Sequence, residues 1–232
     1  MLSGLGTKED PFLIQSAADF EHLITGSFGG KYFRMMTSVD LNNLSFSISS
    51  FNGVLDGNHC SVRGINISST ENTGLFGILE SDNVMSNLSL YGKISGTVCT
   101  GALAGVTKGV VSGAVNYATV FGAGNLGGII GNSSDTSNVN NCVNYGGVLG
   151  SSWNNGGIVG FAQNSLTNCV SFGTVTTSGD CAGGIAGTSH GFISHCINYG
   201  TVEAPGRAGG YCRQMLRHSY RLYKQWYRGR HR

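Results

Sequence analysis

Short apolar runs, each bounded by Gly, Asn or Ser, recur along most of the chain. They are too short for helices, and their apolar positions lack the three- and four-residue spacing of an amphipathic helix. The glycine and asparagine residues between them are typical of turns. The pattern therefore predicts an all-β protein that is built from many short strands.

Two phrases recur with one period. The first is TGLFG, GALAG, GGIIG, GGIVG and GGIAG, at residues 73–77, 101–105, 127–131, 156–160 and 183–187. The second is LSLYGKI, AVNYATV, CVNYGGV, CVSFGTV and CINYGTV, at residues 88–94, 114–120, 142–148, 169–175 and 196–202. The closing glycines are 28, 26, 29 and 27 residues apart, and the aromatic residues are 26, 28, 27 and 27 apart. This agreement predicts a structural repeat of about 27 residues.

One such unit cannot bury a core alone, so successive units must stack. The repeat length fits one coil of a parallel β-helix, in which equivalent residues lie about 4.8 Å apart. We expect glycine at the corners where φ is positive.

Stacking predicts columns of equivalent residues. The column Leu88, Ala114, Cys142, Cys169 and Cys196 is small or apolar, which indicates an inward position. Three cysteines at this interval could bind a metal or act in redox chemistry, but Ala and Leu in the same column favour simple packing. The column Leu90, Asn116, Asn144, Ser171 and Asn198 predicts an inward ladder of amides that bond from coil to coil. We expect Tyr91, Tyr117, Tyr145, Phe172 and Tyr199 to stack in a third column.

The N-terminal segment departs from the repeat. Residues 16–26 predict a short helix that Ser16 caps and Gly26 ends. Residues 31–41 predict one strand, and residues 51–67 predict two strands joined at Asp56-Gly57-Asn58. Because a solenoid needs a cap over its first coil, we assign residues 1–58 to a cap and first coil, and residues 59–206 to the repeats.

Composition narrows the function classes. Charged residues make up 11% of the chain, and residues 1–206 hold six basic and twelve acidic residues. No apolar run is long enough to span a membrane. The seven cysteines, an odd number, fit a disulfide framework poorly. No His and Cys spacing is typical of zinc, so we expect no cofactor and no metal.

The order GTKEDPFLIQSAADFEHL, GKYFRMMTSVDL, FNGVLDGNHCSVRGINI and ENTGLFGIL, followed by GGIVG and NYGTV, resembles bacterial surface proteins with GLUG repeats. Such repeats also occur as non-catalytic segments of immunoglobulin A proteases. The resemblance covers about residues 4–206. It implies a right-handed parallel β-helix, secretion or surface display, and adhesion or spacing. Because no signal peptide is visible at the start, we expect a fragment of a larger surface protein.

The C-terminal segment, residues 207–232, carries eight positive charges among aromatic residues. This composition alone is typical of nucleic-acid binding. However, codons for Tyr211-Cys212-Arg213, shifted by one base, permit Ile-Ala-Gly, and codons for residues 222–229 permit Cys-Ile-Asn-(Asn or Ser)-Gly-Thr-Val, which is similar to the CINYGTV phrase. We therefore interpret the tail as frameshifted, non-native sequence, and we expect no nucleic-acid partner. A truncated last coil would expose an edge that is prone to self-association.

Two functions remain open. The first is a non-enzymatic surface module that acts as an adhesin or spacer and binds an unknown glycan or protein. The alternative is a carbohydrate-active β-helix lyase or hydrolase, which needs paired acids. The candidates are Asp135 and Asp180, in separate turn-like sequences, and His190 and His195. We interpret all four as surface turn residues and predict no catalytic site.

Overall fold

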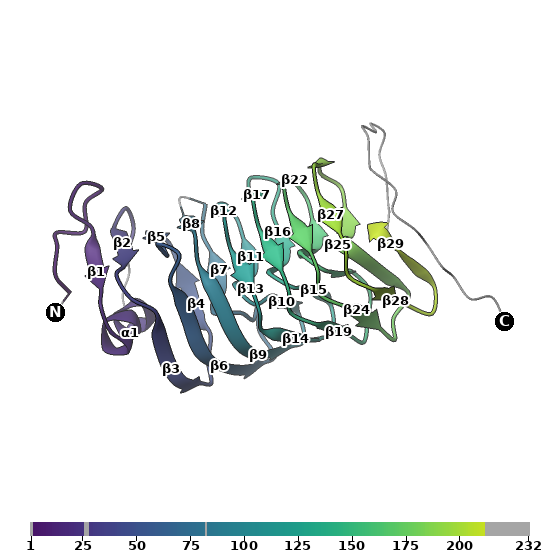
Figure 1. Cartoon of the computed structure of the whole chain (residues 1–232), viewed down its shortest axis with the longest axis horizontal. Helices are drawn as coiled ribbons and strands as arrows, with labels where there is room; N and C mark the ends of the chain where they lie inside the picture. Colours follow the sequence, from purple (N-terminus) through teal and green to yellow (C-terminus); the bar gives the residue numbers. More distant parts are fainter. Residues whose placement is uncertain (1, 26–27, 82, 212–232) are drawn as a thin grey trace.

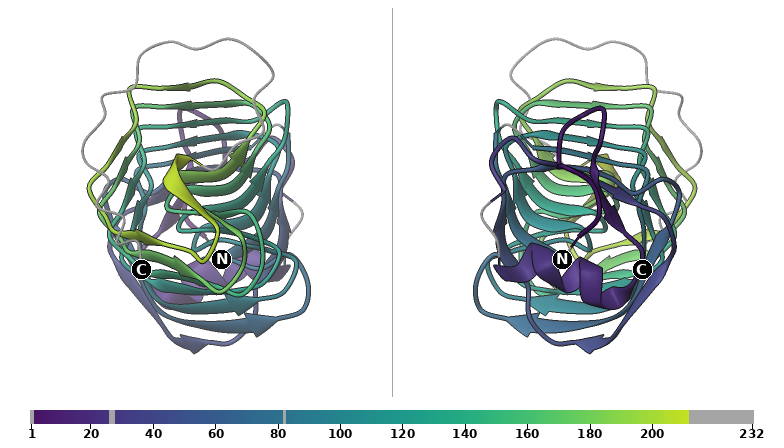
Figure 2. Two further views of the ribbon diagram at one scale, coloured as in Figure 1. Left: turned by 90° about the vertical axis from the view of Figure 1, so that its right-hand side faces the viewer. Right: turned by 90° about the vertical axis from the view of Figure 1, so that its left-hand side faces the viewer.

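The computed structural model describes residues 2–25, 28–81 and 83–211. Its coils lie side by side along one axis, with β1 (Phe12–Ile14) at one end and β29 (Arg207–Tyr211) at the other (Figure 1). A view along that axis shows the coils lying over one another around a common interior (Figure 2). The chain is therefore an elongated solenoid.

Each coil passes in turn through three sheets, which we call the first, second and third sheets. The first sheet contains β1, β2 (Tyr32–Met35), β5 (Val54–Asp56), β8 (Val84–Ser86), β12 (Val110–Ser112), β17 (Asn138–Asn140), β22 (Ser165–Thr167) and β26 (Ile193–Ser194). The second contains β3 (Val39–Leu44), β6 (Ser61–Ser69), β9 (Ser89–Gly96), β13 (Val115–Asn116), β14 (Thr119–Gly122), β18 (Val143–Asn144), β19 (Val148–Gly150), β23 (Val170–Ser171), β24 (Val175–Thr177), β27 (Ile197–Asn198) and β28 (Val202–Glu203). The third contains β4 (Ile48–Phe51), β7 (Phe76–Leu79), β10 (Cys99–Thr100), β11 (Ala104–Thr107), β15 (Asn125–Gly127), β16 (Ile130–Ser133), β20 (Asn155–Gly156), β21 (Val159–Ala162), β25 (Cys181–Ser189) and β29.

Residues that pair between adjacent strands are one repeat apart in the sequence. Val115 pairs in parallel with Val143, Val143 with Val170, and Val170 with Ile197. Each step along the sheet therefore advances the sequence by one repeat. The fold is the parallel β-helix that the sequence predicts, with about 27 residues per coil.

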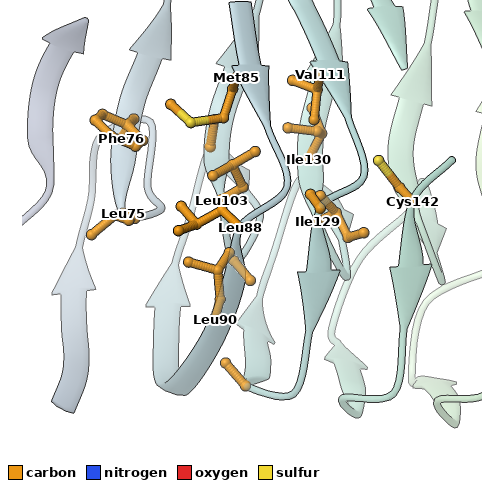
Figure 3. Close-up of a cluster of buried hydrophobic side chains, with 14 of the residues drawn as sticks. Leu75, Phe76, Met85, Leu88, Leu90, Leu103, Val111, Ile129, Ile130 and Cys142 are labelled. Atoms are coloured by element: carbon orange, nitrogen blue, oxygen red, sulfur yellow. The ribbon is translucent and has the colours of Figure 1, made fainter. Parts of the chain in front are cut away.

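The interior is filled by columns of apolar side chains, one coil above another. In the first sheet the column Leu55, Met85, Val111, Val139 and Leu166 is fully buried. Figure 3 shows Met85 and Val111 among the inward side chains of neighbouring coils. The predicted column that runs from Leu88 through Ala114 and Cys142 to Cys169 is also buried, and Cys196 at its end is partly buried. This column therefore packs the core, as the sequence indicates.

The polar column is buried but does not form a continuous amide ladder. Asn116 Nδ2 donates to Asn144 Oδ1 on the next coil at 2.8 Å. Asn144 and Asn198 instead donate to carbonyl oxygens of their own coils, those of Gly146 and Gly200, at 2.9 and 2.8 Å. The buried Ser171 hydroxyl between them has no hydrogen-bond partner in the described structure. One hydrogen bond between asparagine side chains thus joins two coils. The side chains of Asn144 and Asn198 stabilise the turn that follows each of them.

The closing glycines of the first phrase are required by close packing. A Cβ at Gly131 would lie 2.4 Å from the amide nitrogen of Thr100, and one at Gly160 would lie 2.5 Å from that of Leu126. The second glycine of GGI packs similarly against the polar column, because a Cβ at Gly128 would lie 2.6 Å from the Asn144 side-chain amide. Any side chain at these positions would force neighbouring coils or the polar column apart.

A different column carries many of the positive φ angles. The corner between the first and second sheets places one left-handed residue in each of five successive coils: Asn87, Gly113, Asn141, Asn168 and His195, with φ between 52° and 68°. The expectation that glycine turns this corner is correct at Gly113 alone. Asparagine fills three of the other positions because its short polar side chain tolerates this conformation.

At the N-terminal end, α1 (Ala17–Thr25) lies across the first coil (Figure 2). Ser16 caps it as predicted, since its hydroxyl accepts from the Asp19 amide at 3.2 Å and donates to the Asp19 carboxylate at 2.9 Å. Phe20 and Leu23 of this helix are buried. The single strand predicted over residues 31–41 is wrong, because the chain bends between β2 and β3 as it passes from the first sheet to the second.

At the C-terminal end, β29 pairs with β25 in parallel, with Gly209 opposite Gly183. Pairing between coils thus continues beyond residue 206. Residues 212–232, on which most of the frameshift interpretation rests, lie outside the described residues.

Candidate functional surface

The second sheet carries a column of stacked aromatic rings, which we call the aromatic ladder: Tyr91, Tyr117, Tyr145, Phe172 and Tyr199. Successive ring centroids are 4.6, 5.0, 4.9 and 5.1 Å apart, and the rings lie within 4° to 14° of parallel. Each ring follows a buried position by one residue and therefore points outward. The predicted aromatic column is confirmed.

Solvent reaches the edges of the ladder rather than its faces. Tyr117, Tyr145 and Phe172 are 44%, 47% and 44% exposed, although each of their faces meets a neighbouring ring. At the N-terminal end the Arg63 guanidinium covers the Tyr91 ring at 4.6 Å from its centroid. Because the faces are occupied, a sugar or base cannot stack on the inner rings. The stacked rings therefore stabilise the contact between neighbouring coils.

An apolar column borders the ladder on one side, whereas the Arg63 guanidinium lies at its N-terminal end. The outward column Val115, Val143, Val170 and Ile197 runs beside it, two residues earlier in each coil. Burial and the neighbouring rings of Tyr91 and Tyr145 raise the pKa of Tyr117. Its hydroxyl therefore stays protonated at neutral pH and adds no charge to this face.

Among the described residues, two ion pairs join neighbouring coils in the N-terminal half of the solenoid. Lys108 Nζ lies 2.8 Å from Glu80 Oε2, and Ser50 donates to Glu80 Oε1 at 3.1 Å. The hydrogen bond from Lys108, supported by that from Ser50, holds the pKa of Glu80 below its usual value. Arg34 Nε lies 3.7 Å from Asp56 Oδ2. Each pair joins successive coils at partly exposed positions, which is typical of structural ion pairs.

The four candidate catalytic residues are not brought together as a site. Asp135 lies at the corner between the third and first sheets, whereas Asp180 lies at the corner between the second and third sheets. Both are exposed. His190 packs edge-on against Phe161, with centroids 4.9 Å apart, and His195 holds the left-handed corner described above. These contacts give both histidines a structural role.

The cysteine column has the environment of a packed core. Contact with the Cys142 thiol raises the pKa of Cys169, and contact with Cys169 together with burial raises the pKa of Cys196. These thiols stay protonated and are poor nucleophiles. The free thiols are Cys60, Cys99, Cys142, Cys169 and Cys196, whereas Cys181 is disulfide-bonded.

Within residues 2–25, 28–81 and 83–211, no group of three or more His, Cys, Asp or Glu side chains is arranged to hold a metal ion. No described helix has the length and hydropathy needed to cross a bilayer.

The sequence interpretation missed two features of this surface. Arg63 extends the ladder by one coil, because β6 pairs with β9 with Val62 opposite Leu90. The signal was present, since SVRGINI at 61–67 repeats the pattern of SLYGKI at 89–94 with one residue added. The second feature is Trp153, which is 68% exposed at a corner. Its phrase, SSWNN, departs from the repeat and gave no periodic signal.

Comparison with known proteins supports the fold and leaves the family open. No family model matches the chain. It is 28% identical over 150 residues to halomucin from Haloquadratum walsbyi, an alignment that covers 56% of this chain and 2% of halomucin. It is 30% identical over 125 residues to a "putative Gly-rich membrane protein" from Evansella cellulosilytica, which covers 47% of this chain and 14% of that protein.

Among solved structures, the chain is similar to a "putative immunoglobulin A1 protease" from Bacteroides ovatus, with a TM-score of 0.66 and 16% identity. The match covers 91% of this chain and 86% of the other. The chain spans only a small part of the two sequence relatives. The structural match supports the architecture alone: this chain is a parallel β-helix that is similar in fold to the Bacteroides protein.

Proposed function

We propose that this chain is a non-enzymatic repeat module of a secreted or cell-surface protein, in which it acts as a spacer or adhesin. The observation that supports the proposal most is the regular register of its coils in the second sheet from β13 to β27. The aromatic ladder and the apolar columns run through successive coils without a break. A stack of this kind gives a rigid rod whose length follows the number of coils.

The distribution of polar groups also favours this function. The charged side chains that contact one another pair between coils rather than converge on a cleft. Asp135 and Asp180 lie at different corners, so they do not form the acid pair of a glycosidase. The name of the Evansella relative, a Gly-rich membrane protein, and the fold of the Bacteroides protein are consistent with a place at the cell envelope. Self-association through the last coil would join such rods end to end.

Surface display tests the proposal. The chain is placed between a membrane anchor and a small reporter domain, and a second version carries a duplicate of residues 143–169, which is one coil. A spacer raises the reporter by one strand spacing, about 4.8 Å, per added coil, as measured by energy transfer to a membrane dye. An adhesin makes the displaying cells bind mucin-coated surfaces more than cells that carry the anchor alone.

The enzymatic alternative is tested in parallel with the purified chain. We expect no cleavage of immunoglobulin A1 and no release of reducing ends from a polysaccharide panel. Turnover that is lost in Asp135→Ala or Asp180→Ala would contradict the proposal and favour the hydrolase or lyase alternative.

A further inference from the structure

One aromatic side chain on the solenoid surface differs from the ladder. Trp153 is 68% exposed, and no described aromatic ring or cation stacks on its indole. It lies at the corner between β19 of the second sheet and β20 of the third. Trp153 therefore presents to solvent the flat apolar surface that the ladder rings cover for one another.

The backbone that carries Trp153 is held on both sides. The Ser151 amide donates to the Gly122 carbonyl oxygen at 2.9 Å on the preceding coil. The Ser152 carbonyl oxygen accepts from Thr177 Oγ1 at 3.1 Å on the following coil. Asn154 Nδ2 donates to Asn125 Oδ1 at 2.7 Å. The corner is thus anchored before any ligand arrives, which lowers the entropic cost of binding there.

In the neighbouring coils, small and polar residues occupy the corner that corresponds to Trp153. Gly150 pairs with Thr177 and Asn155 with Ala182, so the two corners are equally long and Asp180 occupies the position equivalent to Trp153. On the preceding coil the corner contains Gly124, which has no side chain to cover the indole. Asp180 is exposed, and its carboxylate forms no ion pair or hydrogen bond with the described residues, although its Oδ1 lies close to Gly206 of the following coil. A free aromatic surface thus has an unpaired acceptor one coil away.

We propose that the corner formed by Gly124, Trp153 and Asp180 is a binding site for a neutral glycan. The apolar C–H face of a pyranose would pack on the indole, and its hydroxyl groups would donate to the Asp180 carboxylate. Aromatic anchors with a few placed polar groups are typical of sites that recognise small polar ligands. Residues 1–206 are net acidic, which disfavours an anionic glycan. This inference deepens the adhesin form of the proposed function and rests on it.

Fluorescence of Trp153 reports binding directly. Because Trp226 lies outside the described residues, the chain is used as its Trp226→Phe variant, in which Trp153 is the sole tryptophan. The probes are cellohexaose, mannohexaose and chitohexaose, with polygalacturonate as the anionic comparison. We expect a saturable blue shift with at least one neutral hexasaccharide. We expect at least tenfold weaker binding of polygalacturonate.

Variants assign the site, with binding measured by calorimetry. Trp153→Ala should abolish the heat of binding, and Asp180→Asn should weaken binding up to about tenfold, since a neutral amide oxygen replaces the charged acceptor. Tyr145→Ala, which removes a ladder ring, is the matched control and should bind as the parent chain does. Circular dichroism of each variant verifies that the fold is retained.

The proposal is overturned if no neutral hexasaccharide shifts the fluorescence, or if Trp153→Ala binds as tightly as the parent. It is equally overturned if mucin-coated surfaces capture the parent and Trp153→Ala chains alike, because the adhesive contact would then lie elsewhere. If no glycan binds but the added coil still raises the reporter, the spacer function is supported and the glycan site is not. Failure of the glycan site is therefore distinguishable from failure of the proposed function.

Discussion

The Asn144→Ala variant tests whether the buried polar column stabilises the solenoid. Asn144 is fully buried, donates to the Gly146 carbonyl oxygen at 2.9 Å and accepts from Asn116 Nδ2 at 2.8 Å. It also accepts from the Gly146 amide at 3.1 Å. Truncation to alanine removes all three hydrogen bonds at once.

The hydrogen-bond partners of Asn144 differ in whether they keep another partner after the substitution. The Gly146 amide keeps the Asn116 carbonyl oxygen at 3.2 Å, and Asn116 Nδ2 keeps the Ala118 carbonyl oxygen at 2.9 Å. The Gly146 carbonyl oxygen, by contrast, loses its side-chain donor. An unsatisfied buried acceptor costs about 1–3 kcal/mol, and a lost net hydrogen bond costs about 1 kcal/mol. We therefore expect the free energy of unfolding to fall by about 2–4 kcal/mol, a large share of the stability of a typical domain.

Equilibrium unfolding in urea, followed by circular dichroism, measures this loss if the slope with denaturant is unchanged. Asn144→Leu is the matched control, because Leu90 occupies the same column in an earlier coil. Leucine fills the volume but forms none of these hydrogen bonds, so its loss should stay at about 2–4 kcal/mol, and any larger loss in Asn144→Ala measures the cavity. A loss below about 0.5 kcal/mol in Asn144→Ala would refute the idea that these amides stabilise the turn.

Three further predictions use the same unfolding assay. Ser171→Asn should stabilise the chain by about 1 kcal/mol, because an amide there can donate to the carbonyl oxygen two residues on, as Asn144 and Asn198 do; a destabilised variant would mean that the site lacks room. Gly131→Ala should destabilise by about 1–3 kcal/mol, whereas Gly147→Ala, whose Cβ would meet its nearest neighbours at 3.7 Å, should be nearly neutral. Equal losses at the two sites would contradict the steric explanation of the repeated glycine. Because the pKa of Glu80 is lowered, its ion pair with Lys108 stabilises above the ordinary value of 4.5 and is lost as pH falls through the folded value. Glu80→Gln should flatten this part of the profile, below the ordinary value of 4.5, by up to about 1 kcal/mol since the pair is partly exposed; an unchanged profile would show that the pair adds no stability.

The periodic part of the fold could be predicted from the sequence because each coil repeats the same two phrases. The spacing from Tyr117 to Tyr145 is the strand register itself, so the aromatic ladder and the inward columns follow directly. The helix after Ser16 was predictable for a local reason, its capping residues.

Features that depend on contacts between coils were harder to predict. The strand at residues 31–41 divides because the chain must pass from one sheet to the next, and no local propensity marks that corner. The glycine phrase suggested turns, yet its glycines are fixed by the backbone of a neighbouring coil. Trp153 belongs to a corner whose length varies between coils, so periodicity carries no information about it.

Removal of one whole coil tests the central claim, that this chain is a register-locked rod of equivalent coils. Deleting residues 143–169 joins Cys142 to Val170 and preserves every column, because Val143 and Val170 are register partners. Deleting residues 143–156, about half a coil, is the control and places each later side chain out of register. Small-angle scattering with urea unfolding should show the first variant as a cooperative rod shorter by about 4.8 Å, and the second as unfolded or aggregated. If the whole-coil variant fails to fold while the half-coil variant folds, or if both behave alike, the account of equivalent coils held in register is contradicted.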